Sequence, residues 1–254
     1  MTKPTEASLK PQKKKSRFFL GFLTVLGALF FALFLSLGIW QVERLQWKLD
    51  LIARVDARVH AEPVAAPGKD DWANVNQADD EYRHVSLTGS YLNDKEVLVR
   101  ALTERGSGFW VLTPLRSDDG TLTFINRGFI PDAKRDPSLR TETQIAGETT
   151  VTGLLRMPEP DGFFLRPNDP ARNEWNSRDV KAFAEKEGLG TVAPYFIDAD
   201  AQSNPGNLPI GGLTVVTFRN NHLSYAITWF ALAAMIAGAA VFVWRHERKS
   251  KDIL

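Results

Sequence analysis

Two long runs of uncharged residues constrain this chain more than any other feature of its sequence. They cover residues 18–40 near one end and residues 223–244 near the other. At about 1.5 Å of rise per residue, a helix of either length reaches roughly 33 Å, enough to cross a hydrocarbon core of about 30 Å. A helix also satisfies its own backbone hydrogen bonds, which lipid requires. The sequence therefore predicts two membrane-spanning helices.

A cleaved signal peptide is the alternative for the first run. Ser36 and Gly38 resemble a small-x-small cleavage site. The apolar region of a signal peptide is, however, usually only about 7–15 residues long. The length of the run therefore favours a retained helix.

Basic residues on the outer flanks of the two runs predict the orientation. They are Lys10, Lys13, Lys14, Lys15, Arg17, Arg245, Arg248, Lys249 and Lys251. By the positive-inside rule we expect both termini in the cytoplasm, with residues 1–17 and 245–254 as tails and residues 41–222 as a periplasmic domain. The short lysine tail lacks an Arg/Ser-rich presequence, which favours a bacterial inner membrane over a mitochondrial inner membrane.

The domain between the spans alternates apolar and polar residues with the period of β-strands. We expect strands over residues 84–92, 96–102, 108–115, 121–130, 149–157, 194–198 and 211–218. Seven short strands of this kind predict a mainly β domain, an antiparallel barrel or sandwich, with minor helices.

The connections carry their own signals. Apolar residues at helical spacing from Val42 to Val59 predict that the first helix continues beyond the membrane, and residues 61–80 are expected to form a loop. Residues 117–120, Ser-Asp-Asp-Gly, predict a tight hairpin turn. A helix over 180–187 is expected, capped by Asn176 or Ser177 and ended by Gly188.

Composition excludes several classes of function. The chain has no cysteine, which excludes disulfides, thiol catalysis, thiolate metal sites and haem attachment through a cysteine pair. The net charge is +1 and the basic excess lies in the flanks, so nucleic-acid binding is not expected. Sequence signatures of hydrolases, zinc proteases, phosphate loops and dinucleotide sites are also missing.

His222 stands out among the four histidines because it immediately precedes the second run. A neutral imidazole at the membrane edge is a plausible axial ligand for haem iron, and Arg219 could pair with the haem propionates. The alternative is a polar cap, in which Asn220 or Asn221 accepts from the first-turn N–H groups of the helix. From position alone, the cap is the simpler interpretation.

Several segments together resemble the surfeit locus protein 1 family of cytochrome c oxidase assembly factors. They occur in the family's order and, with the two spans, cover nearly the whole chain. The last is the most specific, because a long run of polar, aromatic and small residues in fixed order is improbable by chance. The segments are GIWQVERLQWKLDLI (38–52), NRGFIP (126–131), NEWNSRD (173–179), PYFID (194–198) and GGLTVVTFRNNHLSYAITWF (211–230).

The resemblance implies a role without catalysis in maturing the haem-copper oxidase. It implies that the protein helps haem a reach subunit I, the large catalytic subunit, or stabilises that subunit, with haem a synthase and membrane lipid as further partners. In bacterial members of the family, a histidine at the mouth of the second span is the proposed haem contact. The matching residue here is His222, so we expect it as an axial ligand of haem a, with Arg219 at a propionate.

Two other hypotheses remain. One is a membrane-anchored extracytoplasmic hydrolase that uses domain carboxylates such as Asp198 and Asp200. The other is a structural chaperone that works without haem, whose helices pack against the oxidase through small residues such as Gly238.

Overall fold

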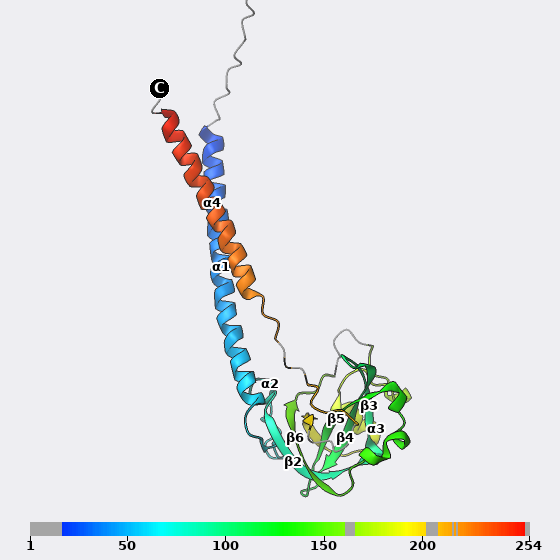
Figure 1. Ribbon diagram of the computed structural model, residues 1–254. Helices are drawn as coiled ribbons and strands as arrows, with labels where there is room; N and C mark the ends of the chain where they lie inside the picture. The colour runs from blue at the N-terminus through cyan, green and yellow to red at the C-terminus, as the bar shows by residue number, and fades with distance from the viewer. Residues whose placement is uncertain (1–16, 161–165, 202–207, 215, 217, 252–254) are drawn as a thin grey trace, which may run out of the picture. The chain divides into compact units, whose positions relative to one another are not determined.

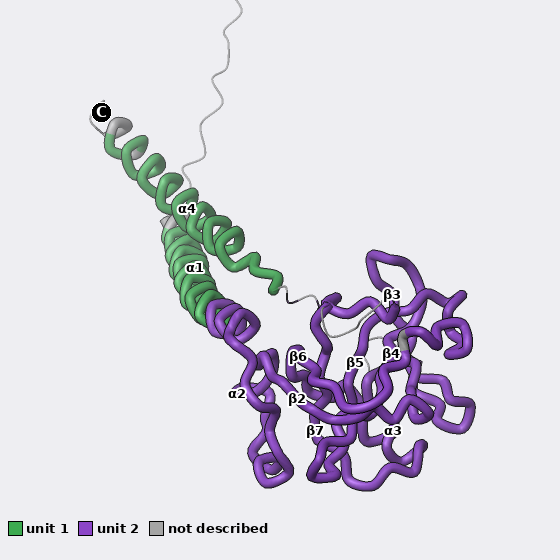
Figure 2. The backbone as a smooth tube through the Cα atoms, turned by 60° about the horizontal axis from the view of Figure 1, so that its bottom comes forward, with its two compact units in different colours: residues 1–51, 218–254 green, residues 52–217 purple. Residues whose placement is uncertain are grey.

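The computed structural model describes residues 17–160, 166–201, 208–214, 216 and 218–251. Residues 1–16 and 252–254, which belong to the predicted tails, lie outside that range. The chain forms two compact units, distinguished by colour in Figure 2. The first comprises residues 1–51 and 218–254, and the second comprises residues 52–217.

The first unit is a pair of helices. Helix α1 spans Arg17–Val59, with its last turns in the second unit, and α4 spans His222–Lys251. Both are long and apolar enough to cross a membrane, and only 6% and 11% of their most apolar stretches are buried. Such exposed apolar helices fit a membrane protein better than the core of a soluble one. The two expected helices are therefore present, and α1 continues past residue 40 as predicted.

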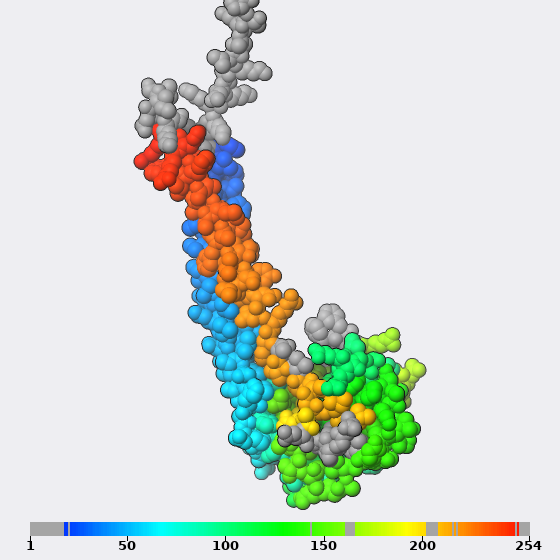
Figure 3. Space-filling model, in the orientation of Figure 1, coloured from blue at the N-terminus to red at the C-terminus, as the bar shows by residue number. Residues whose placement is uncertain are grey.

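Within this unit, α1 and α4 lie side by side (Figures 1 and 3). Small and aromatic residues line the seam between them. Gly38 is the point of closest approach, because a Cβ atom there would lie 2.6 Å from Cε1 of Phe230. One helical turn before Gly38 in α1, the ring of Phe34 stacks on the ring of Trp229 in α4, with their centroids 5.6 Å apart. Close packing of this kind stabilises helix pairs in lipid, where the hydrophobic effect does not drive helices together.

The second unit is a mainly β barrel, as predicted. Its strands are β1 (Val64–Ala65), β2 (His84–Tyr91), β3 (Val97–Thr103), β4 (Gly106–Arg116), β5 (Leu122–Pro131), β6 (Glu148–Arg156) and β7 (Val192–Ala199). They form one sheet in the order β1-β2-β6-β7-β5-β4-β3, and the additional pairing of β2 with β4 closes it. The turn at Ser117 to Gly120 joins β4 to β5 as expected, with Gly120 at φ +80°.

The sheet is mixed rather than wholly antiparallel, which corrects the sequence prediction. Strands β5 and β7 run parallel, as do β1 and β2. The parallel pair arises because the chain leaves β5, builds β6 elsewhere in the sheet and returns through a helix before β7. A parallel pair needs a long crossover of this kind.

Short helices connect the strands of the barrel. They are α2 (Gln77–Asp80), α3 (Val180–Glu187) and the 3-10 turns η1 (Asn93–Lys95), η2 (Asp132–Lys134), η3 (Pro137–Thr143) and η4 (Pro170–Arg172). Helix α3 packs on the sheet through Phe183, which is fully buried. The centroids of the Phe183 and Trp175 rings lie 4.7 Å apart. Since β1 and α2 fall within residues 61–80, that segment is not simply the predicted loop.

The cap of α3 also differs from the prediction, although Gly188 ends the helix with φ +63° as expected. Asp179 accepts from the Ala182 N–H at 3.1 Å and is the N-cap. Asn176 and Ser177 instead donate their backbone N–H groups to Oδ1 of Asn168. These two residues are thus committed to an adjacent loop before the helix begins.

The expected strand at 211–218 is not formed in the described residues 211–214 and 216. Just before this segment, Ile210 forms an isolated bridge to Phe129 of β5. Gly212 then takes φ +68°, and Gly211 lies so close to Asp200 that a Cβ would be 2.7 Å from the Asp200 carbonyl oxygen. The two glycines turn the chain out of extended conformation.

Candidate functional site

A polar contact joins the two helices across their seam. Nδ1 of His222, the first residue of α4, lies 2.7 Å from Oε1 of Gln41 on α1. His222 is half-buried, while Gln41 is only 8% exposed. Among the described residues of this unit, Gln41 is the one buried polar side chain.

Helix periodicity explains why these two residues meet. Gln41 follows Gly38 by three positions and therefore lies on the same face of α1. His222 precedes buried Ala226 by four positions and Phe230 by eight, which places all three on one face of α4. The two polar side chains thus meet about one turn beyond Gly38 in α1 and about two turns before Phe230 in α4.

The helix cap predicted as the alternative role of this segment is also present. The backbone N–H of His222 donates to the side-chain Oδ1 of Asn220 at 3.3 Å, and the backbone carbonyl of Asn221 accepts the first regular helix bond, from the Tyr225 N–H, at 3.2 Å. Asparagines supply these acceptors, so the cap does not use the imidazole. The cap and a ligand role for the His222 ring are therefore compatible.

The ring geometry fits a haem contact. An acceptor opposite Nδ1 favours a proton on that nitrogen and leaves the lone pair on Nε2, the arrangement that a metal-ligating histidine needs. No group of three or more His, Cys, Asp or Glu side chains able to hold a metal ion occurs in the part of the chain that the structure describes. A single histidine suits iron that is already held by a porphyrin, as in haem proteins with one protein ligand.

Basic and aromatic side chains surround this end of the helix pair. Arg219 is exposed, three residues before His222, and the described contacts do not join it to the imidazole. Nζ of Lys48 lies 4.8 Å from the centre of the Phe218 ring, and Cζ of Arg44 lies 4.6 Å from that of Trp47. Arg44 and Arg219 are exposed and Lys48 is partly buried, and cations of this kind suit anionic groups such as carboxylates or lipid phosphates.

Most of the small residues proposed to contact a partner are exposed on α4, but Ala233, which belongs to the same set, is only 3% exposed. A Cβ atom at Gly238 would have nothing within 4 Å in the described structure. Ala234 and Ala237 are exposed as well. The face of α4 around Gly238 is therefore free of the α1 contact.

In the barrel, Asp198 belongs to a network of ionic hydrogen bonds. It is 4% exposed and borders a hollow of about 680 Å³. Its Oδ1 accepts from Asn126 at 2.7 Å, and its Oδ2 accepts from Arg156 at 3.0 Å and from Thr214 at 2.9 Å. Burial would lower the pKa of Arg156, but Asp198 and Glu81 outweigh burial and raise it.

Asp200 has a different partner from Asp198. Its Oδ2 lies 2.8 Å from Nε2 of His84, while Nδ1 of His84 lies 2.8 Å from the Ala61 carbonyl oxygen. Partial burial alone would lower the pKa of His84. The hydrogen bonds to Ala61 and Asp200 outweigh it and raise the pKa above its ordinary value of 6.5.

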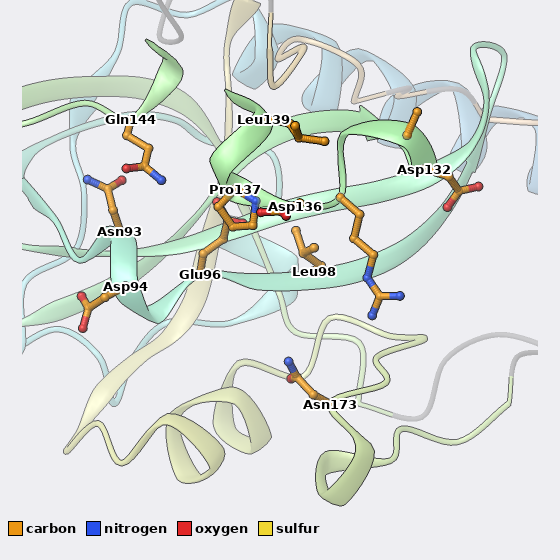
Figure 4. A pocket seen from close by; sticks show the side chains of 12 residues that line it. Asn93, Asp94, Glu96, Leu98, Asp132, Asp136, Pro137, Leu139, Gln144 and Asn173 are labelled. Carbon is orange, nitrogen blue, oxygen red and sulfur yellow. The ribbon is translucent and has the colours of Figure 1, made fainter. Parts of the chain in front are cut away.

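A second hollow on the barrel, of about 1060 Å³, is lined in part by acidic side chains and was not predicted from the sequence (Figure 4). Asp94, Asp132 and Asp136 line it beside Arg135. Its lining residues belong to segments far apart in the sequence, and Figure 4 shows Asn173 on a different segment from Asn93 and Asp132. The spacing of residues in the sequence therefore did not predict this hollow. Gln41 was missed too, although a polar residue three positions after a glycine at the end of an apolar run was an available clue.

Comparison with known proteins is consistent across most of the chain. The model of the SURF1 family matches residues 28–234, a range that includes both Gln41 and His222. Surfeit locus protein 1 of Homo sapiens is 39% identical over 226 residues, which cover 82% of this chain and 72% of the human protein. A SURF1-like protein of Monosiga brevicollis is 37% identical over 224 residues, 83% of each chain. With a family match over most of its length and relatives of this similarity, the chain belongs to the SURF1 family.

Proposed function

We propose that this protein is a non-enzymatic assembly factor for haem-copper cytochrome c oxidase, which holds haem a on its way to subunit I. The family resemblance supports the oxidase role. The observation that carries the haem role is the position of His222, at the start of α4 with Nδ1 against Gln41 and its other nitrogen directed away from that bond.

In this proposal haem a is cargo rather than a resident cofactor. The neutral imidazole of His222 binds the iron through Nε2, and Arg219 pairs with a propionate. One protein ligand gives a weaker hold than two, which suits transfer to another protein. Subunit I is the proposed recipient and haem a synthase the proposed donor.

We place the protein in a bacterial inner membrane with both termini in the cytoplasm and the barrel in the periplasm. The basic flanks of the two spans support this orientation. Membrane lipid then surrounds the apolar faces of α1 and α4, and the basic and aromatic side chains near His222 lie at the outer surface.

A hydrolase is the less favoured hypothesis. A general base needs a carboxylate that can reach substrate, whereas both Asp198 oxygens accept hydrogen bonds and Asp200 contacts His84. A chaperone that works without haem has one specific observation in its favour, the open small-residue face of α4 around Gly238. Gly238→Leu should then stop oxidase maturation while His222→Ala should not.

The deciding experiment is the visible spectrum of full-length protein purified in detergent from cells that make haem a. Haem in the wild type and its loss from His222→Ala are expected. His246→Ala, an exposed histidine near the other end of α4, is the matched control and should retain haem. Folded wild-type protein without haem would refute haem binding and favour the chaperone.

A further inference from the structure

We infer that Gln41 is a positioning residue that fixes the tautomer of His222, holding the proton on Nδ1 and presenting the lone pair of Nε2 to the iron. The inference rests on the proposed haem role of His222. It assigns to Gln41 a specific task in that role, which no feature of the sequence pattern gave it.

The geometry points from Gln41 to one nitrogen of the ring. The side-chain oxygen Oε1 of Gln41 faces Nδ1 of His222 at 2.7 Å, a short hydrogen bond for a nitrogen–oxygen pair. An amide oxygen only accepts, so Nδ1 must carry the proton. A neutral imidazole has a single N–H, and Nε2 is then the unprotonated nitrogen.

Burial makes this contact selective. Gln41 lies in the seam beside Gly38, where helix packing limits the rotamers of its side chain. A buried amide is costly unless it is hydrogen-bonded, so the contact with His222 holds both side chains in place. An imidazole without such an acceptor would exchange between its two tautomers and rotamers.

The same bond changes the ligand strength of the ring. In a histidine that binds a metal through one ring nitrogen, a hydrogen bond from the N–H of the other ring nitrogen to an acceptor raises the basicity of the binding nitrogen. Loss of the acceptor in Gln41→Leu should therefore weaken the iron bond and raise the midpoint potential of bound haem. Gln41→Glu keeps an acceptor and should lower that potential.

The first test needs no haem. We expect the ¹⁵N spectrum of histidine-labelled, full-length, haem-free protein in detergent at about pH 8 to show His222 protonated on Nδ1. The signal is assigned by its loss in His222→Ala. In Gln41→Leu the proton should move largely to Nε2, whereas in Gln41→Glu it should stay on Nδ1.

Phe34→Leu is the matched control, because it removes the stack with Trp229 from the same helix seam without touching Gln41. This variant should keep the wild-type tautomer. A proton on Nε2 in the wild type, or an unchanged tautomer in Gln41→Leu, would overturn the inference.

The second test measures haem a binding by titration in detergent. Gln41→Leu should bind haem a roughly tenfold or more weakly, within the usual range for the partner of a metal-ligating histidine, while Gln41→Glu and Phe34→Leu stay near the wild type. Equal binding by wild type and Gln41→Leu would overturn the role of Gln41 and leave the proposed function standing. No binding by the wild type would refute the proposed function, whichever tautomer the first test finds.

Discussion

In the barrel, several buried charged side chains form hydrogen-bonded networks with one another, whereas in the described helix pair a single polar side chain is buried and it contacts a histidine. Asp198 alone has three hydrogen-bonding partners from three parts of the barrel. Gln41 has His222. The networks of the barrel stabilise its fold, whereas the proposed task of Gln41 is to orient His222.

This comparison predicts that polar substitutions in the barrel should cost stability, and that those in the helix seam should chiefly affect binding. Variants of Arg140 and Asp198 test the expected loss of stability in the barrel. A variant of Gly38 tests whether the contact between the two helices depends on the shape of the seam.

The largest effect is expected at Arg140, which is fully buried and forms a two-pronged ion pair with Glu96. Arg140→Met leaves the Glu96 carboxylate buried without its cation and should lower the free energy of unfolding by about 3–5 kcal/mol. Chemical unfolding of the full-length protein in detergent measures this loss. Arg100→Met, at an exposed position of β3, should cost less than about 0.5 kcal/mol.

The double variant Arg140→Met with Glu96→Leu sharpens this prediction. Replacing both charges by apolar side chains removes the stranded carboxylate and should recover much of the stability. A double variant as unstable as Arg140→Met would mean that the packing of Arg140, not its charge, dominates.

Asp198→Asn should lower the free energy of unfolding by about 1.5–3 kcal/mol, because it removes the charge shared by Arg156 and Arg178 but keeps the side-chain shape. The same unfolding measurement applies. Haem binding should stay unchanged. Wild-type stability accompanied by loss of an enzymatic activity would instead support the hydrolase hypothesis.

In the helix seam, Gly38→Leu should weaken the pairing of α1 and α4 by about 1–2 kcal/mol, since the new side chain collides with Phe230. The natural chain has no cysteine, so a disulfide between Gly27→Cys and Ile236→Cys reports the pairing directly. Its yield should fall in Gly38→Leu. Gly21→Leu, where a Cβ meets nothing within 4 Å, should leave the yield unchanged.

The smallest expected effect is the pH dependence contributed by His84. Its pKa is raised in the folded protein, so its stabilisation is complete below its ordinary value of 6.5 and is lost as pH rises through the folded pKa. The partly exposed ion pair with Asp200 should contribute less than about 1 kcal/mol. Unfolding measured from about pH 6 to 9 should show this loss in the wild type, and His84→Gln should flatten it. An equally steep slope in His84→Gln would assign the dependence to another group.

The sequence predicted local structure well wherever a pattern repeats. The uncharged runs predicted both helices, and the alternation in β2 and β6 predicted the strands that carry Val85 and Val151 into the core. The segment at 211–218 misled because its apolar residues satisfy the strand pattern. Gly211 and Gly212 override that pattern through close approach and positive φ, which periodicity does not report.

The candidate site could be predicted only in part, for a related reason. His222 was visible because its position relative to the second apolar run is a local feature. Gln41 is 181 positions away, and its contact depends on the seam set by Gly38 and Phe230. The acidic hollow also depends on tertiary placement, since its lining residues belong to separate segments.

The closure of the barrel through β2 has a consequence for the order of events during synthesis. Strands β3, β4 and β5 follow one another through short turns and can pair soon after they leave the ribosome. Strand β2 is made before them, yet it pairs mainly with β6, with Thr88 and Thr150 opposite each other 62 positions apart. Until β6 has been made, one edge of β2 lacks its partner along His84–Ser90, while the other edge can already pair with β1 and β4. The barrel is thus sealed late, along one of the first strands that the ribosome produces.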